Sequence, residues 1–544
     1  MNSTTVRPNA PLPAPPATRR GHAGWWVAGG LGLALYLPAV WFDWLPWLRG
    51  WRTYPEGWSW GTYPIPPLAR FLPVLAWMAV LCGAVLLGTR LLPVAARGVR
   101  ARVGRALVLA LLVLSSYGLQ IALLGLKDAN PQRLLVERVT NRVFTSYFTL
   151  AAAPTTHLST FFRDYPAVFN TKLCPHCHEH PPGPALFYWL VLRGNASLPA
   201  PLQHDLGAAT RRLVGDSPAL AALQPPLTDA QFVGAVAGGN LVLLLAATLV
   251  LPLYGLARLL APRAPPWWLA GLAVAVPGVL LMAPEFDQGL GLVTAGALYC
   301  GLRGLRTSQR RAAAAWAGAA GIILAVGLFF TWAPVVLFGV FVGLGFLAWG
   351  YGRSALFAPA DTGSRLPARQ VAAWLAAFVA GTALVELVLT VGLGFDLPYV
   401  LQYNLNNAAF AEARRPYAVW IFFGPLDFLQ FLGLPLALAA LAALVLPARA
   451  AHGPAPGAPL ARVAPWLSRI NPYAALFWGL LLAIDLAGRT KAEQGRLLLY
   501  LAPLALVAVY VWVERTRPDT RILAAVLAAQ LLVTLVLGAR WFVP

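Results

Sequence analysis

Charged residues are scarce in this chain. Only 11% of its 544 residues are Asp, Glu, Lys or Arg, whereas 59% are hydrophobic. This composition gives far more apolar surface than one soluble core can bury, so it excludes an ordinary water-soluble domain and predicts a chain that resides in a membrane. Residues 1–23, with their Pro and Ala tract, contain no apolar stretch for a signal sequence. They predict a disordered cytoplasmic tail.

Acidic residues are the rarer charged class, with 20 Asp and Glu against 41 Lys and Arg and a net charge of +21. In a membrane protein such an excess is interpreted through its distribution among short loops, so we expect no nucleic-acid partner. The arginine-rich segments at residues 97–105 and 303–311 predict cytoplasmic loops. They also predict a multi-pass protein with a cytoplasmic N-terminus.

Long apolar segments recur along the chain. Residues 106–126 and 371–393 are each long enough, as α-helices, to cross a hydrocarbon layer of roughly 30 Å. We expect about thirteen such helices, from the length that a span requires. They begin near Gly24, Phe71, Ala106, Phe232, Trp267, Gly289, Ala312, Val335, Val371, Phe428, Ile470, Leu497 and Ile522. The predicted fold is an all-α integral membrane protein, with three helices in residues 24–126 and the remaining bundle in residues 230–544.

The longest polar insertion covers residues 127–229 and contains no apolar stretch of membrane length. It predicts a large extracytoplasmic loop. Within it, PALFYWLVL at residues 184–192 is too short to span a membrane and predicts a juxtamembrane helix along the interface. Outside the inner segments that hold Asp361, Glu514 and Asp519, and apart from Glu386 within a helix, every acidic residue falls on the predicted outer side. Two interpretations remain open: carboxylate chemistry on that side, or inner loops that are merely short and rich in Arg.

One segment of the insertion is dense in reactive side chains. FFRDYPAVFNTKLCPHCHEHPPGPALFYWLVL contains Asp164, Glu179 and His180, followed by a Pro-Pro-Gly sequence that restricts the backbone before a helix. A helix that starts there would hold an imidazole at the membrane surface, with its first amides available to an anion. This segment is therefore the first place to look for a site.

The same segment contains a C-x-x-C pair. Cys174, Cys177 and His176 match the ligand types of a zinc site, but no second C-x-x-C is present in the chain. An extracytoplasmic location favours a disulfide between Cys174 and Cys177 over a metal site. Free thiols are the third alternative, so a divalent metal remains a possible cofactor and no cofactor is certain.

Three motifs on the predicted outer side carry a resemblance to a known family. They are HPPGPALFYW, LMAPEFDQGLGLVTAGALYCGL and AGRTKAEQGRLLLYLAP, and the resemblance that they carry covers residues 127–503 approximately. In this order they resemble the GT-C superfamily of membrane glycosyltransferases, which take sugars from polyprenyl-phosphate carriers. The similarity is to bacterial members like the protein O-mannosyltransferases and the lipid A aminoarabinose transferases.

The resemblance implies a GT-C-like fold and an inverting transfer of a sugar from a polyprenyl-phosphate donor to a lipid, glycan or protein acceptor. It also implies a place in the bacterial cytoplasmic (inner) membrane, among membrane lipids, with the reaction serving the cell envelope. Two departures stand out. Two extra helices precede the large loop, and Ser146 stands beside Tyr147 where the family places an acid.

Because that acid is missing, the catalytic base must come from elsewhere. We assign it to Asp164, the acid nearest in sequence to the His-Pro-Pro-Gly element, and keep Asp128 and Glu137 as alternatives. His180 would organise the donor phosphate or the carboxylate. For Asp164 the alternative role is an ion pair with Arg163 or a turn cap.

Basic residues in two later outer segments are candidates for the donor phosphate, because a planar guanidinium suits phosphate. They are Arg489, Arg496, Arg414 and Arg415. Further candidate acids are Glu285, Asp287 and Glu493. The structural alternative for Arg414 and Arg415 is anchoring at the membrane interface. For Arg489, Arg496 and Glu493 it is an ion-paired turn. For Glu285 and Asp287 it is helix capping.

Two other functions compete with a transferase. A transporter or lipid flippase would need charged side chains along a path through the bilayer, and only Glu386 lies deep in a predicted helix. A non-catalytic scaffold of the same fold would account for the missing acid at Ser146.

Overall fold

The structure is a computed structural model. It describes residues 19–51, 58–93, 96–142, 146–153, 158–171, 174–223, 225–357, 366–446, 470–516 and 520–542. The predicted N-terminal tail therefore lies outside the described residues as far as residue 18, and residues 19–23 belong to the first helix instead.

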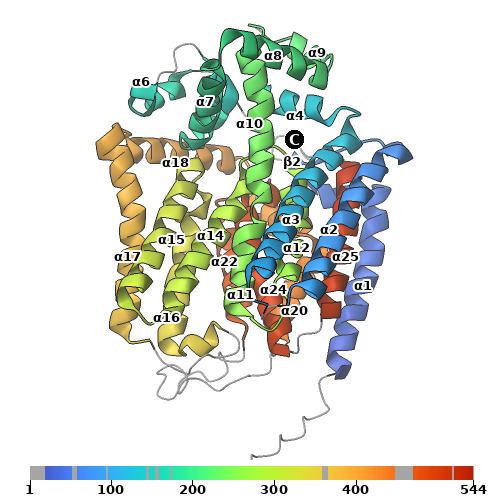
Figure 1. Ribbon diagram of the computed structural model, residues 1–544, viewed down its shortest axis with the longest axis vertical. Helices are drawn as coiled ribbons and strands as arrows, with labels where there is room; N and C mark the ends of the chain where they lie inside the picture. Colours follow the sequence, from blue (N-terminus) through green and yellow to red (C-terminus); the bar gives the residue numbers. More distant parts are fainter. Residues whose placement is uncertain are drawn as a thin grey trace, which may run out of the picture.

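Within the described residues, nine helical segments are long and apolar enough to cross a membrane. They consist of α1 (Arg19–Trp41), α2 (Phe71–Leu91), α3 (Val99–Lys127), α10 (Asp229–Ala247) with α11 (Val250–Leu260), α15 (Arg310–Phe330), α16 (Leu337–Gly350), α17 (Ala368–Leu387), α24 (Ala502–Thr516) and α25 (Thr520–Arg540). In Figure 1 they form one upright bundle. The chain is thus an all-α membrane protein of many spans.

The predicted number of thirteen spans is not confirmed. The apolar segment from Trp267 is divided into α12 (Trp267–Val274) and α13 (Pro277–Leu281). The segment near Phe428 is divided into α19 (Tyr417–Leu432) and α20 (Leu434–Val445), which meet at 106° and would give a tenth span if counted as one. The other two predicted spans, near Gly289 and Ile470, correspond to the glycine-rich α14 (Asp287–Arg306) and the 16-residue α22 (Pro472–Ala487). Neither helix is among the nine segments.

The bend between α19 and α20 has a local cause. Gly433 has a φ of 94°, in the left-handed region that favours glycine. A Cβ atom there would lie 2.0 Å from Oε1 of Gln530, whose side chain donates to the carbonyl of Leu432 at 2.9 Å. The bend therefore depends both on the backbone freedom of Gly433 and on the space that it leaves for Gln530.

Between α3 and α10 the chain forms only short helices, which cover one end of the bundle (Figure 1). They are α4 (Pro131–Thr140), α5 (Tyr147–Ala151), α6 (Leu158–Asp164), η3 (Tyr165–Asn170), η4 (Pro175–His178), α7 (Gly183–Ala196), α8 (Ala200–Val214) and α9 (Pro218–Ala221). We call this end of the bundle the loop end. The helix expected at residues 184–192 is α7.

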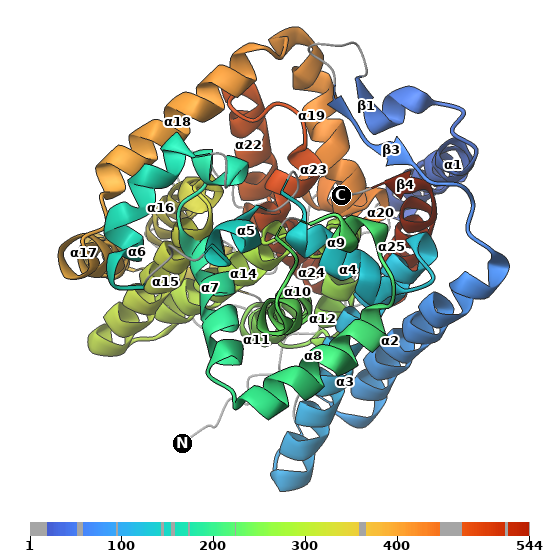
Figure 2. The same ribbon diagram turned by 90° about the horizontal axis from the view of Figure 1, so that it is seen from above.

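Other short elements connect the longer helices. α18 (Leu397–Ala413) runs across the loop end and leads to α19 (Figures 1 and 2). The described residues contain two pairs of two-residue strands. One pairs β1 (Gly50–Trp51) with β2 (Trp58–Ser59), and the other pairs β3 (Gly61–Thr62), before α2, with β4 (Trp541–Phe542), after α25. The short helical turns are η1 (Pro46–Arg49), η2 (Leu68–Arg70), η5 (Ala333–Val336), η6 (Arg353–Ala355), the π-helical turn Val388–Gly392, α23 (Gln494–Leu497) and η9 (Leu499–Leu501).

The spans differ in how much of their surface faces protein. The segment that contains α24 is the centre of the bundle, since 94% of the residues in its apolar 18-residue stretch are buried. α17 lies at the edge, with 28% of the corresponding residues buried. α17 is held to α15 by close backbone contact, since a Cβ at Gly321 would lie 2.0 Å from the carbonyl oxygen of Phe378. A peripheral helix thus keeps a fixed position through its glycine contacts.

Candidate functional site

A buried arginine gathers carboxylates at the loop end. Nε of Arg496 lies 3.3 Å from Oδ2 of Asp287, and its Nη2 lies 2.8 Å from Oε2 of Glu493. The Arg496 side chain is only 13% exposed. Asp287 begins α14, whereas Glu493 and Arg496 lie at the start of the α24 segment, so the ion pairs join two elements that are far apart in the sequence. We call Glu285, Asp287, Glu493 and Arg496 the carboxylate cluster.

Glu285 is the member of the carboxylate cluster without an ion pair in the described part of the chain. It lies just before α14 and is 5% exposed. Burial raises the pKa of its carboxyl to about 8, although the nearby Arg496 and Arg138 guanidinium groups act in the opposite direction. A carboxyl with such a pKa changes its protonation near physiological pH, as a general acid or base requires.

Aromatic and imidazole rings lie beside this cluster. The Tyr147 ring centroid is 6.0 Å from the His176 ring and 6.0 Å from the His180 ring. Burial lowers the pKa of His176 to about 4 and that of His180 to about 3, and the positive charge of Arg496 contributes to both. Both imidazoles are therefore neutral at neutral pH. They can donate or accept hydrogen bonds there but cannot act as cations toward a phosphate.

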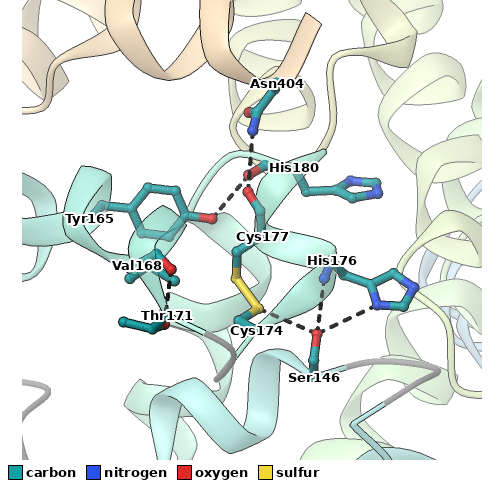
Figure 3. Close-up of a disulfide and its surroundings, with 9 residues drawn as sticks. All are labelled: Ser146, Tyr165, Val168, Thr171, Cys174, His176, Cys177, His180 and Asn404. Atoms are coloured by element: carbon teal, nitrogen blue, oxygen red, sulfur yellow. Dashed lines mark hydrogen bonds between the residues drawn. A yellow bond between two sulfur atoms is a disulfide. The ribbon is translucent and has the colours of Figure 1, made fainter. Parts of the chain in front are cut away.

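The C-x-x-C pair forms a disulfide (Figure 3). The Sγ atoms of Cys174 and Cys177 are bonded at 2.03 Å, and both residues are fully buried. Ser146 connects the bridge to the site, since its Oγ lies 3.4 Å from Cys174 Sγ and accepts a hydrogen bond from the His176 backbone N–H at 3.2 Å. The disulfide thus fixes the short helix η4 that carries His176.

The metal site considered for Cys174, Cys177 and His176 is wrong in this structure, because the disulfide leaves no thiolate to bind an ion. Elsewhere in the described residues, no three His, Cys, Asp or Glu side chains come together in a way that could hold a metal. Between Asp287 and Glu493 the compensating positive charge is the Arg496 guanidinium. A divalent metal cofactor therefore does not fit the residues of the carboxylate cluster.

α18 is anchored to the disulfide segment by residues that the sequence did not single out. Asn404, which is buried, donates to the carbonyl of Cys177 at 3.2 Å and accepts from Nε1 of Trp332 at 3.0 Å. The Tyr403 hydroxyl lies 3.2 Å from Nδ1 of His178. Nothing in the local sequence of α18 indicates these long-range partners.

The predicted phosphate-binding arginines have different surroundings. Nη1 of Arg415 lies 3.3 Å from Oε1 of Glu412, and Nζ of Lys491 donates to the carbonyl of Arg415 at 3.0 Å. The Lys491 contact ties the turn between α18 and α19 to the segment before α23. Arg414 and Arg489 are exposed and form no ion pair within the described residues, although the Arg414 guanidinium lies over the Phe410 ring.

The three acids proposed as base lie outside the carboxylate cluster. Asp164 is exposed at the end of α6. Asp128 accepts from Nε of Arg133 at 3.0 Å, and Glu137 accepts from the Ser217 hydroxyl at 2.6 Å, so both have local structural partners. The role of Asp164 stays a prediction.

Asp427 is a buried carboxyl that sequence reasoning did not select. Its Oδ1 accepts from Nε1 of Trp60 at 2.6 Å, and its Oδ2 accepts from the backbone N–H of Gly495 at 2.8 Å. Gly495 directly precedes Arg496. Asp427 therefore positions the turn that carries the central guanidinium.

Comparison with known proteins gives one loose structural likeness. No protein-family model matches the chain, and no curated protein matches it significantly. The crystal structure of the Archaeoglobus fulgidus oligosaccharyltransferase, a complex with Zn and sulfate, is similar with a TM-score of 0.38 and 15% sequence identity. The match covers 79% of this chain and 52% of that one, so the chain spans about half the length of the archaeal protein.

Proposed function

We propose that this chain is a membrane glycosyltransferase that transfers a sugar from a polyprenyl-phosphate carrier to a lipid, glycan or protein acceptor at the loop end. The observation that carries the proposal is the buried Glu285 carboxyl beside Arg496, in a membrane-embedded bundle and close to the His-Pro-Pro-Gly segment. The motif resemblance to the GT-C enzymes supports the same conclusion.

The reaction requires one proton acceptor and one leaving group. The acceptor hydroxyl oxygen attacks the anomeric carbon of the donor, its proton passes to the Glu285 carboxylate, and the bond from that carbon to the phosphate oxygen breaks. The phosphate leaves with the electron pair and remains on the polyprenyl carrier. Because the displacement is direct, it inverts the anomeric configuration.

Arg496 has a supporting role in this scheme. Its guanidinium is held by Asp287 and Glu493 at 3.3 and 2.8 Å, so its charge is fixed beside Glu285. A fixed positive charge favours the ionised form of Glu285 that accepts the proton, against the effect of burial. Arg496 therefore increases the fraction of Glu285 that is ionised and able to accept the proton.

Exposed arginines at the loop end could bind the phosphate of the polyprenyl carrier. Arg414 and Arg489 are exposed, and they lie on two segments that the contacts of Arg415 and Lys491 fasten together. Guanidinium groups suit phosphate oxygens and stabilise the charge that develops on the leaving group. We assign donor binding to Arg414 and Arg489. The loop end would then face the outside of the bacterial cytoplasmic membrane, and the product would serve the cell envelope.

A transport function has less support. Glu386, the acid deep in a predicted helix, lies on α17 at the edge of the bundle, where most of the helix faces away from the protein. A polar path would be expected in the interior instead, around α24.

The proposal is tested with the purified full-length protein in lipid nanodiscs. It is supplied with a panel of polyprenyl-phosphate sugars that differ in the sugar, mannose included, together with extracted envelope lipids and glycans. We expect at least one donor to be consumed with release of free polyprenyl phosphate, detected by mass spectrometry. Consumption of none of the panel, by protein that is folded and binds the donors, would contradict the proposal.

A further inference from the structure

A cavity of about 190 Å³ lies between α15 and α17, where both helices begin. Figure 1 places these helix starts at the end of the bundle opposite the loop end. The lining residues are Arg310, Ala313, Ala314, Arg369, Gln370, Ala373 and Trp374. This cavity is remote from the carboxylate cluster.

The cavity persists because the two helices are fixed further along. A Cβ at Gly381 would lie 2.1 Å from the carbonyl oxygen of Gly318, so the backbones touch there. Trp374 adds a second fixed point, as its Nε1 donates to the carbonyl of Gly301 on α14 at 3.1 Å. The first turns of α15 and α17 therefore leave a defined space between them.

Among the residues that the structure describes, the positive charge around the cavity has no acid paired with it. Arg310, Arg311 and Arg369 are exposed and form no ion pair in the described part of the chain. Arg303, one helix earlier, lies over the Trp316 ring with its guanidinium carbon 5.2 Å from the ring centroid. The described residues around the cavity opening thus carry a net positive charge.

The backbone N–H groups at the two helix starts would also favour an anion. The residues that precede α15 and α17, Gln309 and Pro367, make no side-chain cap to the first turn of either helix. The first N–H groups of a helix have no partner inside the helix, and the helix dipole makes its N-terminus favourable for an anion. Arg310 and Arg369, which line the cavity, lie in these first turns.

The remaining wall is apolar and lies at the edge of the bundle. Ala313, Ala314 and Ala373 line it. In α17, only 28% of the residues in the apolar 18-residue stretch are buried within the protein. A free phosphate ion would gain nothing from this apolar wall, whereas the glycerol and first acyl carbons of a phospholipid would be buried against it.

We propose that the cavity between α15 and α17 is a binding site for the phosphate head group of an anionic phospholipid. Arg310, Arg369 and the first amides of the two helices hold the phosphate, and the alanine wall holds the adjoining glycerol and acyl carbons. Basic pockets between membrane helices on the arginine-rich side commonly bind such head groups. This site is independent of the proposed transfer reaction.

The test measures lipid retention on the delipidated full-length protein by native mass spectrometry, with phosphatidylglycerol or phosphatidylcholine added. The double variant Arg310→Ala/Arg369→Ala removes the two cavity arginines. The matched control, Arg100→Ala/Arg102→Ala, removes two exposed arginines from the first turns of α3 at the same end of the bundle. A third variant, Ala314→Leu, fills the cavity and keeps every charge.

We expect the wild-type protein to prefer phosphatidylglycerol, and the cavity double variant to bind it about tenfold more weakly or worse. The control should stay within about twofold of the wild type, because its arginines do not line this cavity. Ala314→Leu should also lose phosphatidylglycerol, with an unchanged unfolding temperature.

Equal losses in the cavity and control variants would mean general charge attraction and would overturn the proposal. So would full binding by the cavity double variant. Inorganic phosphate at millimolar concentration serves as competitor: displacement of the lipid by phosphate alone would identify a free-anion site and contradict the assignment to a lipid.

Discussion

Arg496 on α23 and Asp287 at the beginning of α14 join these two helices at the loop end, with 3.3 Å between Nε and Oδ2. The same guanidinium also pairs with Glu493, so one cation serves carboxylates on two segments. Breaking a buried pair by removing one partner leaves an uncompensated charge. The stability of the loop end and the protonation of Glu285 should therefore both respond to Arg496.

Replacing Arg496 by Ala should destabilise the protein by about 3–5 kcal/mol, as removal of one partner of a buried ion pair does. Thermal unfolding in detergent micelles measures the change. Arg489→Ala provides the control, since Arg489 is exposed and close by in the sequence. Equal unfolding temperatures for the two variants would show that the Arg496 pairs contribute little.

The transfer rate should depend on the protonation of Glu285. A general base acts in its deprotonated form, and burial raises the Glu285 pKa to about 8, so kcat/KM should rise with pH and level off above that value. The charged groups that face it are Arg496, Asp287, Arg138 and Glu493. His176 and His180 stay neutral throughout this range, because burial lowers their pKa values to about 4 and 3. A rate that falls between pH 6 and 8 would contradict this role.

Stability should change with pH in the opposite direction. The Glu285 pKa is raised in the folded protein above its ordinary value of 4.5, so the folded state holds the proton more tightly than the unfolded state. The resulting contribution to stability is complete below about pH 4.5 and is lost as the pH rises through about 8. The Glu285→Gln variant, which cannot ionise, should lack this part of the pH dependence of unfolding.

Changing Cys174 and Cys177 together to Ser should lower stability by about 2 kcal/mol, as expected for a disulfide that closes a short loop. Substrate turnover should survive, since a direct displacement needs no thiol nucleophile. Unfolding is followed with and without reductant, and the reductant should affect only the wild-type protein. Loss of turnover in a folded double variant would instead assign the cysteines a direct part in catalysis.

The loop end should be extracytoplasmic. A cysteine placed at Ser197, which is exposed at the end of α7, should react with a membrane-impermeant maleimide in intact cells. Cys82 on α2 and Cys300 on α14 are the free cysteines of the described residues, so the wild-type protein gives the background. Labelling only after permeabilisation would reverse the orientation and exclude an outer site.

The sequence predicted the membrane class and the polar segment between α3 and α10, because long apolar runs and their interruptions are visible locally. It did not reveal the breaks at Pro277 and Gly433, which divide apolar segments that look continuous in composition. Glu285 and Arg496 were both named as candidates, yet their proximity could not be inferred, since it depends on how distant helices pack. Asp164 is near His180 in sequence, but the intervening turns leave it exposed.

The central claim is that Glu285 accepts the proton during sugar transfer. Single-turnover transfer, with donor binding measured separately, should be compared in Glu285→Gln and Asp164→Asn, with Asp128→Asn and Glu137→Gln beside them. We predict that Glu285→Gln binds the donor normally and loses about 10² to 10⁴ in rate, as removal of a general base does. The other three variants should transfer at close to the wild-type rate. Near-normal transfer by folded Glu285→Gln, with the loss in Asp164→Asn instead, would contradict the account and return the role to Asp164.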